Sequence, residues 1–253
     1  ALTLFLLVPS VTQSFGVSAL PSVTRAFQTG DSQKLKRTVE AVLRITFLTA
    51  LPMGVGLSVL AQPAALLIYG ARPGTVIVGR VLTTLGAASV FAALCGPLSS
   101  ILQAMGHVEL PVVLTLIGLF VKAVLDYTLA AVPRVNVLGG AIGTLVCYAL
   151  TSVLACIAIR RIAGVKIDFF STFKKPFLAS VCCGVAALLT HKAWCAVLPE
   201  SRFSALPAVF LGALIYVVFL LIARGICEED IKALPNGEKI TKRLEKYLQK
   251  AGG

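Results

Sequence analysis

The stretch PVVLTLIGLFVKAVLDYTLAAV, residues 111–132, decides the fold class. About 20 mainly apolar residues cross the hydrocarbon core of a bilayer as a helix, and only Lys122 and Asp126 carry charge in this run. The whole sequence has the same character, because 57% of its 253 residues are hydrophobic and 13% are charged. A soluble domain carries about 25% charged residues, and a disordered chain lacks this much apolar surface. Both classes are therefore excluded.

Apolar windows predict an all-α, polytopic membrane bundle of about seven spans, at about 20 residues for each span. In order, they cover residues 2–26, 38–60, 76–104, 111–132, 137–159, 176–198 and 204–223. We expect residues 1–224 to form the bundle. Proline and glycine inside several spans favour the broken helices of a transporter over a rigid anchor, since such breaks are tolerated where neighbouring helices satisfy the backbone.

The distribution of Lys and Arg in the loops predicts the orientation of the chain. One side carries Arg25, Lys34, Lys36, Arg37, Arg160, Arg161, Lys166, Lys174 and Lys175, and the other only Arg72, Arg134 and Arg202 in its loops. The basic side is predicted to be cytoplasmic, which places Ala1 outside and Gly253 inside. Because the chain opens on Ala1 without the basic region of a signal peptide, we expect it to be a piece of a longer protein.

Residues 225–253 differ from the bundle and form a predicted cytoplasmic, basic, amphipathic tail. Ile240, Leu244 and Leu248 recur at helical spacing among charged residues. Such a helix suits the surface of an anionic leaflet, and a solvated helix packed on the last cytoplasmic loop is the alternative interpretation.

Lys122 and Asp126 are the most informative polar residues, because both lie inside a span. A charge at the bilayer centre costs about 2.5–3.5 kcal/mol on insertion scales, so it needs protein or water around it. At a spacing of four residues the two side chains share a helix face and neutralise each other. They either hold helices together or line a path for substrate or ions, and snorkelling is a third interpretation.

The first span has a polar stripe at helical spacing that includes Ser10, Gln13, Ser14 and Ser18. Such a stripe lines a hydrated cleft or joins helices, and we favour the cleft. Arg44 lies about two turns inside its helix, where it either snorkels to the cytoplasm or holds a lipid phosphate. Gly139 and Gly143 form a GxxxG pair, which indicates close helix packing.

Other classes of function find no support in the sequence. Aromatic residues are not interleaved with the basic ones, as stacking on bases requires, so we expect no nucleic-acid partner. The seven cysteines form no CxxC pair and most lie in apolar runs, where they act as small hydrophobes. We find no HExxH, GxSxG or P-loop motif, and so we expect neither catalytic residues nor a metal or cofactor.

Several segments together resemble the C-terminal half of a polysaccharide exporter, in the superfamily of multidrug and oligosaccharidyl-lipid flippases. The resemblance is strongest to members of the stage V sporulation protein B type. The segments are LPSVTRAF with the following Gly30-Asp31, LPMGVGLSVLAQPAALLIYG (51–70), ILQAMG (101–106), NVLGGAIGT (136–144) and DIKALPNGEKI (230–240). Their order and spacing cover essentially the whole chain.

This resemblance implies two pseudo-symmetric bundles around a central cleft, with fourteen helices in this branch of the superfamily. The seven spans here would be the last seven, and the N-terminal half of the same transporter would be the missing partner. The implied cargo is a lipid-linked oligosaccharide, moved across a bacterial cytoplasmic membrane by alternating access. On polarity alone, Lys122 and Arg44 are candidate cations for its pyrophosphate, and Gln13, Ser14 and Ser18 are candidate contacts for sugar or water.

Three rival functions remain open from the sequence. A cation-coupled multidrug antiporter of the same superfamily needs an ionisable acid, a role that Asp126 could fill. A receptor also has seven spans, but we find no DRY-like or NPxxY-like signature. A membrane-embedded glycan-processing enzyme is expected to have a large external loop, and every predicted external loop here is short. We place the flippase first, the antiporter second and the enzyme last.

Overall fold

The computed structural model describes residues 2–70, 72, 74–131, 137–164, 169–197, 211 and 214–216. The described residues are almost all helical and contain no strand. The helices are α1 (Leu2–Gln28), α2 (Ser32–Val59), α3 (Ala61–Tyr69), α4 (Thr75–Ala104), α5 (Glu109–Ala130), α6 (Val137–Ala163) and α7 (Phe169–Val197). The predicted all-α class is confirmed.

The first six predicted spans correspond to helices of the structure. Five of them, α1, α2, α4, α5 and α6, are long and apolar enough to cross a membrane, and α7 contains a shorter apolar stretch, Pro176–Thr190. Of the seventh predicted span, residues 204–223, the structure describes only Leu211 and residues 214–216, which are helical. The predicted tail, residues 225–253, lies outside the described residues.

Helix α3 (Ala61–Tyr69) was not predicted from the sequence. A second helix follows α2 directly at Leu60, which closes α2 and opens α3. Pro63 lies in the first turn of α3, where a backbone N–H has no helical acceptor and proline is tolerated. Gly70 ends the helix with a φ of 69°, a conformation that favours glycine. Its nine residues are too few for a membrane span, so the apolar windows left this segment between two predicted spans.

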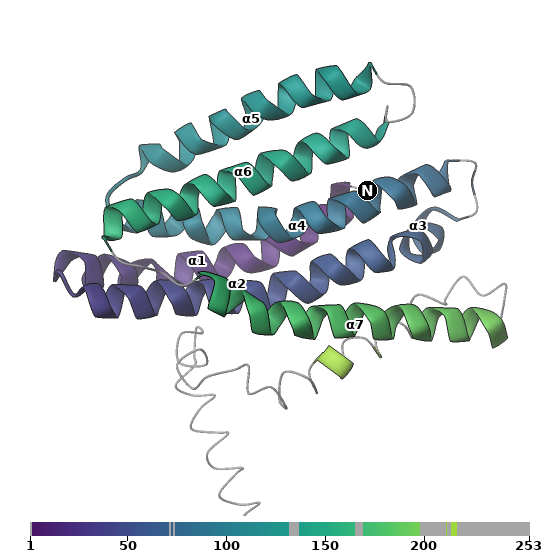
Figure 1. Ribbon diagram of the computed structural model, residues 1–253, viewed down its shortest axis with the longest axis horizontal. Coiled ribbons are helices and arrows are strands. Elements are labelled where there is room, and N and C mark those ends of the chain that lie inside the picture. The colour runs from purple at the N-terminus through teal and green to yellow at the C-terminus, as the bar shows by residue number, and fades with distance from the viewer. Residues whose placement is uncertain are drawn as a thin grey trace, which may run out of the picture.

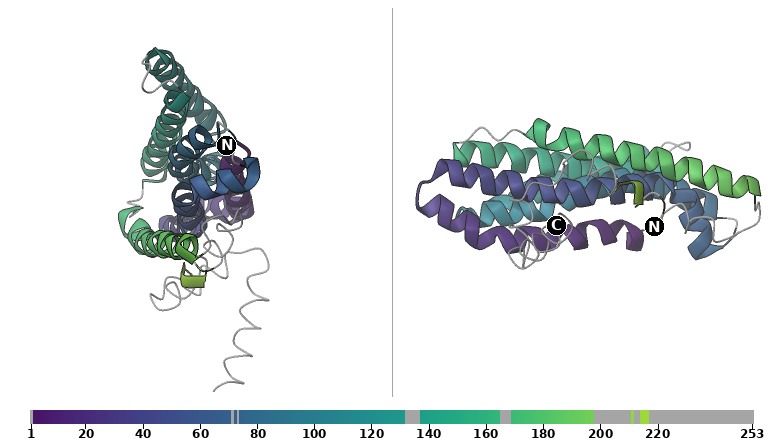
Figure 2. Two further views of the ribbon diagram at one scale, coloured as in Figure 1. Left: turned by 90° about the vertical axis from the view of Figure 1, so that its right-hand side faces the viewer. Right: turned by 90° about the horizontal axis from the view of Figure 1, so that it is seen from below.

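Helix α4 is the centre of the bundle and packs against α1, α2, α3 and α6 (Figure 1). Helix α5 packs on the outer side of α6, and α7 packs on α2. Figure 2 shows the α5–α6 pair and α7 on opposite sides of the α1–α4 core. The bundle therefore has a buried centre and two flanks that carry large exposed apolar side chains, such as Phe120 and Leu189.

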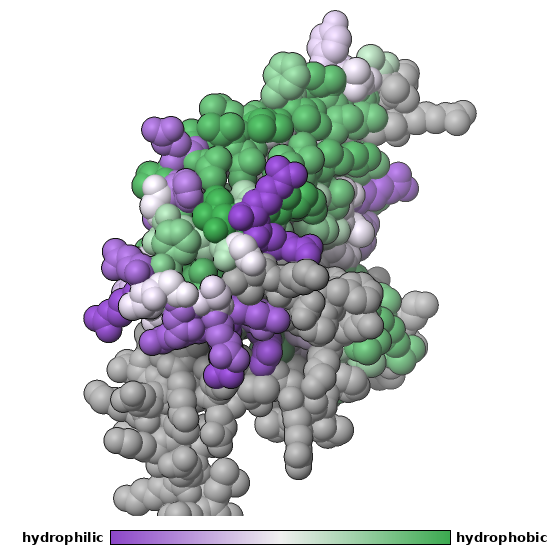
Figure 3. Space-filling model, turned by 60° about the vertical axis from the view of Figure 1, so that its left-hand side comes forward, coloured by the Kyte–Doolittle hydropathy of each residue, from purple (hydrophilic) through white to green (hydrophobic). Residues whose placement is uncertain are grey.

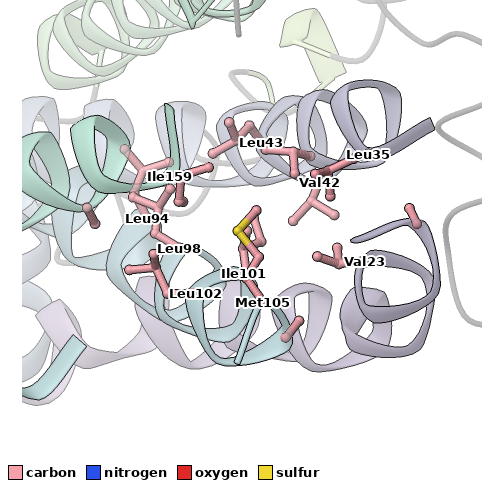
Figure 4. Packing of buried hydrophobic residues seen from close by; sticks show 14 of the residues in the cluster. Val23, Leu35, Val42, Leu43, Leu94, Leu98, Ile101, Leu102, Met105 and Ile159 are labelled. Atoms are coloured by element: carbon pink, nitrogen blue, oxygen red, sulfur yellow. The ribbon is translucent and has the colours of Figure 1, made fainter. Parts of the chain in front are cut away.

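The largest buried cluster lies where α1, α2, α4 and α6 meet, near the end at which α1 joins α2 (Figure 4). Leu98, Ile101 and Leu102 of α4 are at most 1% exposed and face Val23, Leu43 and Ile159 of the other three helices. Lipid tails are as apolar as these side chains, so the cohesion comes from close packing more than from a hydrophobic driving force.

Small residues bring the helix backbones together at the centre. A Cβ on Gly86 of α4 would come 2.6 Å from the Ser58 backbone nitrogen and 2.9 Å from the Gly54 carbonyl oxygen of α2. A Cβ on Gly16 of α1 would come 2.6 Å from Cα of Pro97 in α4. Because only glycine fits at either crossing, the backbones of α1 and α2 can pack directly against the backbone of α4.

Charged side chains gather at the end of the bundle that holds the α1–α2 connection and the end of α6. Arg25, Lys34, Arg37, Arg160 and Arg161 are exposed there. Figure 3, which turns this end toward the viewer, shows hydrophilic groups beside an apolar surface. The helices therefore bring basic residues from separate loops to one end, as the sidedness argument requires. Which side of the membrane this end faces stays a prediction.

Candidate functional site

The polar stripe of α1 lies on the exposed face of that helix. Ser10, Gln13, Ser14 and Ser18 are all exposed in the described bundle. The hydroxyls of Ser10 and Ser18 donate to carbonyl oxygens of their own helix, Leu7 and Ser14, each at 2.8 Å. The hydroxyl hydrogens are therefore satisfied locally, and both side chains stay exposed.

The opposite face of α1 is buried against α4. Its residues Phe5, Val8, Thr12 and Gly16 pack inside the bundle, and Thr12 Oγ1 donates to the Ala93 carbonyl oxygen of α4 at 3.0 Å. Helix α1 thus has one face fixed on the bundle, while its polar face stays exposed. Gln13 borders α4 at the edge of that face, because a Cβ on Gly96 would lie 3.5 Å from Gln13 Cγ. A polar face on a membrane helix requires a hydrated cleft or another helix to cover it.

The predicted pair of Lys122 and Asp126 forms on α5. The lysine Nζ makes an ion pair with Asp126 Oδ2, and the two side chains are 29% and 34% exposed. The other carboxylate oxygen, Oδ1, is buried and has no hydrogen-bond partner in the described part of the chain. The pair therefore neutralises itself within one helix and leaves one acceptor unsatisfied.

Glycine at position 143 makes room for this pair on α6. A Cβ there would contact Asp126 Oδ1 and would lie 3.1 Å from Asp126 Cγ and 3.5 Å from Lys122 Cγ. One turn earlier, a Cβ on Gly139 would lie 2.9 Å from Cβ of Leu129 in α5. The expected close packing of the GxxxG pair is confirmed, and α5 is its partner.

The predicted site residues do not form one cluster. Helix α1 packs extensively on α2 and α4, whereas α5 packs on α6, so the stripe of α1 and the ion pair of α5 belong to different parts of the bundle. Arg44 is half-buried on α2, with buried residues on both sides of it in the sequence. Whether any of these residues lines a cargo path stays a prediction.

Hydroxyl groups that join helices were not predicted as site residues. Besides Thr12, Ser152 of α6 donates to the Phe91 carbonyl oxygen of α4 at 2.9 Å, and Ser58 of α2 donates to the Thr83 carbonyl oxygen at 3.0 Å. A signal for Thr12 was present, because its spacing from Val8 and Gly16 places it on the apolar face of α1. Its acceptor depends on which helix packs there, which spacing does not reveal.

Within the described ranges, no arrangement of side chains suits metal binding or disulfide redox chemistry. His, Cys, Asp and Glu side chains there do not assemble in groups of three or more that could hold a metal ion. Cys95, Cys147, Cys156, Cys182 and Cys183 form no disulfide. The site is thus made of hydroxyls, one amide and charged side chains.

Comparison with known proteins decides the family. The family model described as "Lipid II flippase MurJ" matches residues 5–217, which includes every helix described above except the first turn of α1. The chain belongs to the MurJ family. The resemblance to lipid-linked oligosaccharide flippases of the wider superfamily is thereby confirmed.

Curated relatives from Bacillus subtilis (strain 168) agree with the MurJ-family assignment. Stage V sporulation protein B is 24% identical over 93% of this chain and 44% of its own length. The uncharacterized membrane protein YabM is 22% identical over 94% of the chain and 44% of its own length. Lipid II flippase MurJ is 24% identical over 61% of the chain and 28% of its own length. This MurJ-family chain spans about half the length of the two curated relatives that it matches over most of its own length.

Proposed function

We propose that this chain forms the C-terminal half of a flippase that moves a lipid-linked oligosaccharide across the bacterial cytoplasmic membrane. The observation that carries the proposal is the match of the MurJ family from residue 5 to residue 217, through the whole described bundle. The relatives' names refer to a lipid II flippase and a sporulation protein. The function proposed is transport, without a catalytic step on the cargo.

The exposed face of α1 is the proposed wall of the cargo cleft. Gln13, Ser14 and Ser18 offer amide and hydroxyl groups to sugar or to the water around it, while the other face of α1 is held on α4. The polyprenyl tail of the cargo can stay in lipid, since it needs no polar partner. Opening this cleft to alternate sides requires a second bundle opposite α1, which we propose is the N-terminal half present in longer relatives.

For Lys122 and Asp126 we propose a structural role in preference to cargo binding. Each charge already has its partner, and the pair packs against Gly143 at the α5–α6 contact. Binding a pyrophosphate at Lys122 would leave the half-buried Asp126 carboxylate without its counter-ion, which is costly. Arg44 keeps the role proposed from its position alone, since it is half-buried within α2. The same pairing weakens the case for Asp126 as the coupling acid of an antiporter.

The basic end of the bundle is proposed to face the cytoplasm, with the C-terminus on the same side. The supporting observation is that exposed Arg and Lys side chains from the α1–α2 connection and the end of α6 meet at one end. Cytoplasmic loops of membrane proteins carry this excess of basic residues.

The test uses the intact protein as its gene encodes it, reconstituted in liposomes with a fluorescent polyprenyl-pyrophosphoryl oligosaccharide. Exchange between leaflets is compared for the native protein, the Gln13→Ala/Ser18→Ala variant and a Thr128→Val control. Thr128 is exposed on α5 and, like Ser18, donates to a carbonyl oxygen of its own helix, at 3.0 Å. We expect a loss of about tenfold or more in the α1 variant, equivalent to about 1.4 kcal/mol in the rate-limiting barrier, and none in the control.

Equal exchange by the α1 variant and the control, at equal folded yield, would remove α1 from the cargo path. A parallel measurement on Lys122→Ala separates the two roles of that residue. Loss of exchange without loss of thermal stability would return Lys122 to the path, and loss of stability with exchange retained per folded molecule supports the structural role.

A further inference from the structure

The two helices at the centre of the bundle, α2 and α4, are each interrupted by one proline, Pro52 and Pro97. Proline has no backbone N–H, so the carbonyl four residues earlier loses its helical donor. The carbonyl oxygens concerned are those of Leu48 and Ala93. Because the hydrocarbon core has no water to replace the donor, each oxygen needs a partner from the protein.

Both freed oxygens receive a hydroxyl from another part of the chain. The Tyr216 hydroxyl donates to the Leu48 carbonyl oxygen at 2.6 Å, across 168 residues of sequence. Thr12 Oγ1 donates to the Ala93 carbonyl oxygen at 3.0 Å, across 81 residues. Tyr216 is 7% exposed and Thr12 is 0% exposed. Each carbonyl oxygen that a proline leaves without its helical donor therefore accepts a side-chain hydroxyl, one from α1 and one from residues 214–216.

The surroundings of each bond fix the donor at the proline. One turn after Thr12, Gly16 lies so close to Pro97 that only glycine fits between the two backbones. Tyr216 packs with Ala179 and Cys183 of α7 in a small buried cluster that also touches Leu48. Each hydroxyl thus belongs to a segment that packs directly on the interrupted helix.

We infer that Thr12 and Tyr216 are positioning residues that latch the proline breaks of α4 and α2 to their neighbours. A helix bends most easily where proline removes a hydrogen bond. A donor from a second helix ties any bending at that point to movement of the donor's own segment. Pro97 is thereby coupled to α1, and Pro52 is coupled to the segment at residues 214–216.

The Thr12 latch is built to release. Its single hydroxyl hydrogen has two further acceptors in α1, the Pro9 carbonyl oxygen at 3.1 Å and the Val8 carbonyl oxygen at 3.4 Å. If α1 slides on α4, Thr12 keeps a partner and only Ala93 loses one. That α1 moves during transport rests on the proposed function, whereas the latch itself does not.

The test is a pair of double-mutant cycles on the intact protein in detergent, read as melting temperature. Tyr216→Phe and Thr12→Val remove the hydroxyls with little change of shape. Pro52→Ala and Pro97→Ala restore the missing N–H. We expect each hydroxyl variant to lower the melting temperature by about 2–6 °C when the proline is present, and by less than about 1 °C when alanine supplies the N–H.

Ser152→Ala is the matched control for the α4 cycle. Ser152 also donates to a carbonyl of α4, Phe91, at 2.9 Å, but that oxygen keeps its helical donor at Cys95 because no proline stands there. Its effect should therefore be the same with and without Pro97→Ala. Pro52→Leu and Pro97→Leu also restore the N–H and serve as second backgrounds if an alanine variant fails to fold.

Equal losses with and without the proline, for either hydroxyl, overturn the latch at that helix. Leaflet exchange of the fluorescent cargo is measured on the same samples. Coupled cycles in a protein that shows no exchange at all retain the latch and refute the proposed function. Additive cycles in a protein that exchanges cargo refute the latch and leave the proposed function standing.

Discussion

Gly143 of α6 faces the carboxylate of Asp126 on α5 so closely that a Cβ at this position would lie 3.1 Å from Asp126 Cγ. The contact joins two observations that are separate in the sequence, an ion pair inside a span and a GxxxG pair on the next helix. It shows that the small residues of α6 accommodate the charged face of α5, and it makes the position sensitive to a single methyl group.

Gly143→Ala is expected to destabilise the protein by about 1–3 kcal/mol, the usual range for overpacking a tight contact. The methyl group would force Asp126 and Lys122 away from α6. Melting temperature in detergent measures the effect, with Gly140→Ala as control. A Cβ on Gly140 meets nothing within 4 Å, so this variant should be neutral or slightly stabilising. Equal behaviour of the two variants would contradict the packing described for α5 on α6.

Removal of one member of the ion pair should cost more than removal of both. Lys122→Met leaves a half-buried carboxylate whose Oδ1 has no hydrogen-bond partner among the described residues, and we expect a loss of about 1–3 kcal/mol. Lys122→Met/Asp126→Leu replaces the pair by apolar groups and should recover most of this loss. A double variant that is less stable than Lys122→Met would show that Asp126 has a stabilising partner besides Lys122.

The crossing of α2 and α4 should be the least tolerant point of the bundle. Gly86→Ala would place a methyl group 2.6 Å from the Ser58 backbone nitrogen and 2.9 Å from the Gly54 carbonyl oxygen, and backbone atoms cannot move aside as side chains do. We expect a loss of about 3 kcal/mol or no folded protein. Gly56→Ala on α2, where a Cβ meets nothing within 4 Å, is the control. Wild-type stability of Gly86→Ala would mean that α2 and α4 do not meet here.

The orientation of the bundle is testable with single cysteines in a variant that lacks the native thiols. Gln33 at the start of α2 and Gly74 just before α4 are both exposed. The starts of these two helices lie at opposite ends of the bundle (Figure 1). If the basic end is cytoplasmic, an impermeant thiol reagent added to intact cells should label Gly74→Cys and should reach Gln33→Cys only after permeabilisation. The reverse pattern would invert the topology.

The sequence predicted the larger elements because long apolar runs identify spans directly. The limits of α4, α5 and the start of α6 agree with the prediction within about two residues, which is the usual uncertainty at helix ends. Helix α3 was not predicted because its nine apolar residues are too few to be recognised as a membrane span.

Only those features of the candidate site that lie within a single helix were predictable from the sequence. That Ser10, Gln13 and Ser18 share one face followed from their spacing on one helix, and so did the pairing of Lys122 with Asp126. The contact of Gly143 with Asp126 and the bond from Thr12 to Ala93 depend on which helices are neighbours. Spacing within a helix carries no information about that choice.

The most direct test of the central claim is leaflet exchange by the intact native protein in liposomes. A fluorescent polyprenyl-pyrophosphoryl oligosaccharide is placed in the outer leaflet, and its exchange is compared with protein-free liposomes and with efflux of a cationic dye under a proton or sodium gradient. The account predicts rapid exchange of the lipid-linked sugar and no gradient-driven dye efflux. Dye efflux without exchange of the sugar would contradict it and would identify a drug antiporter.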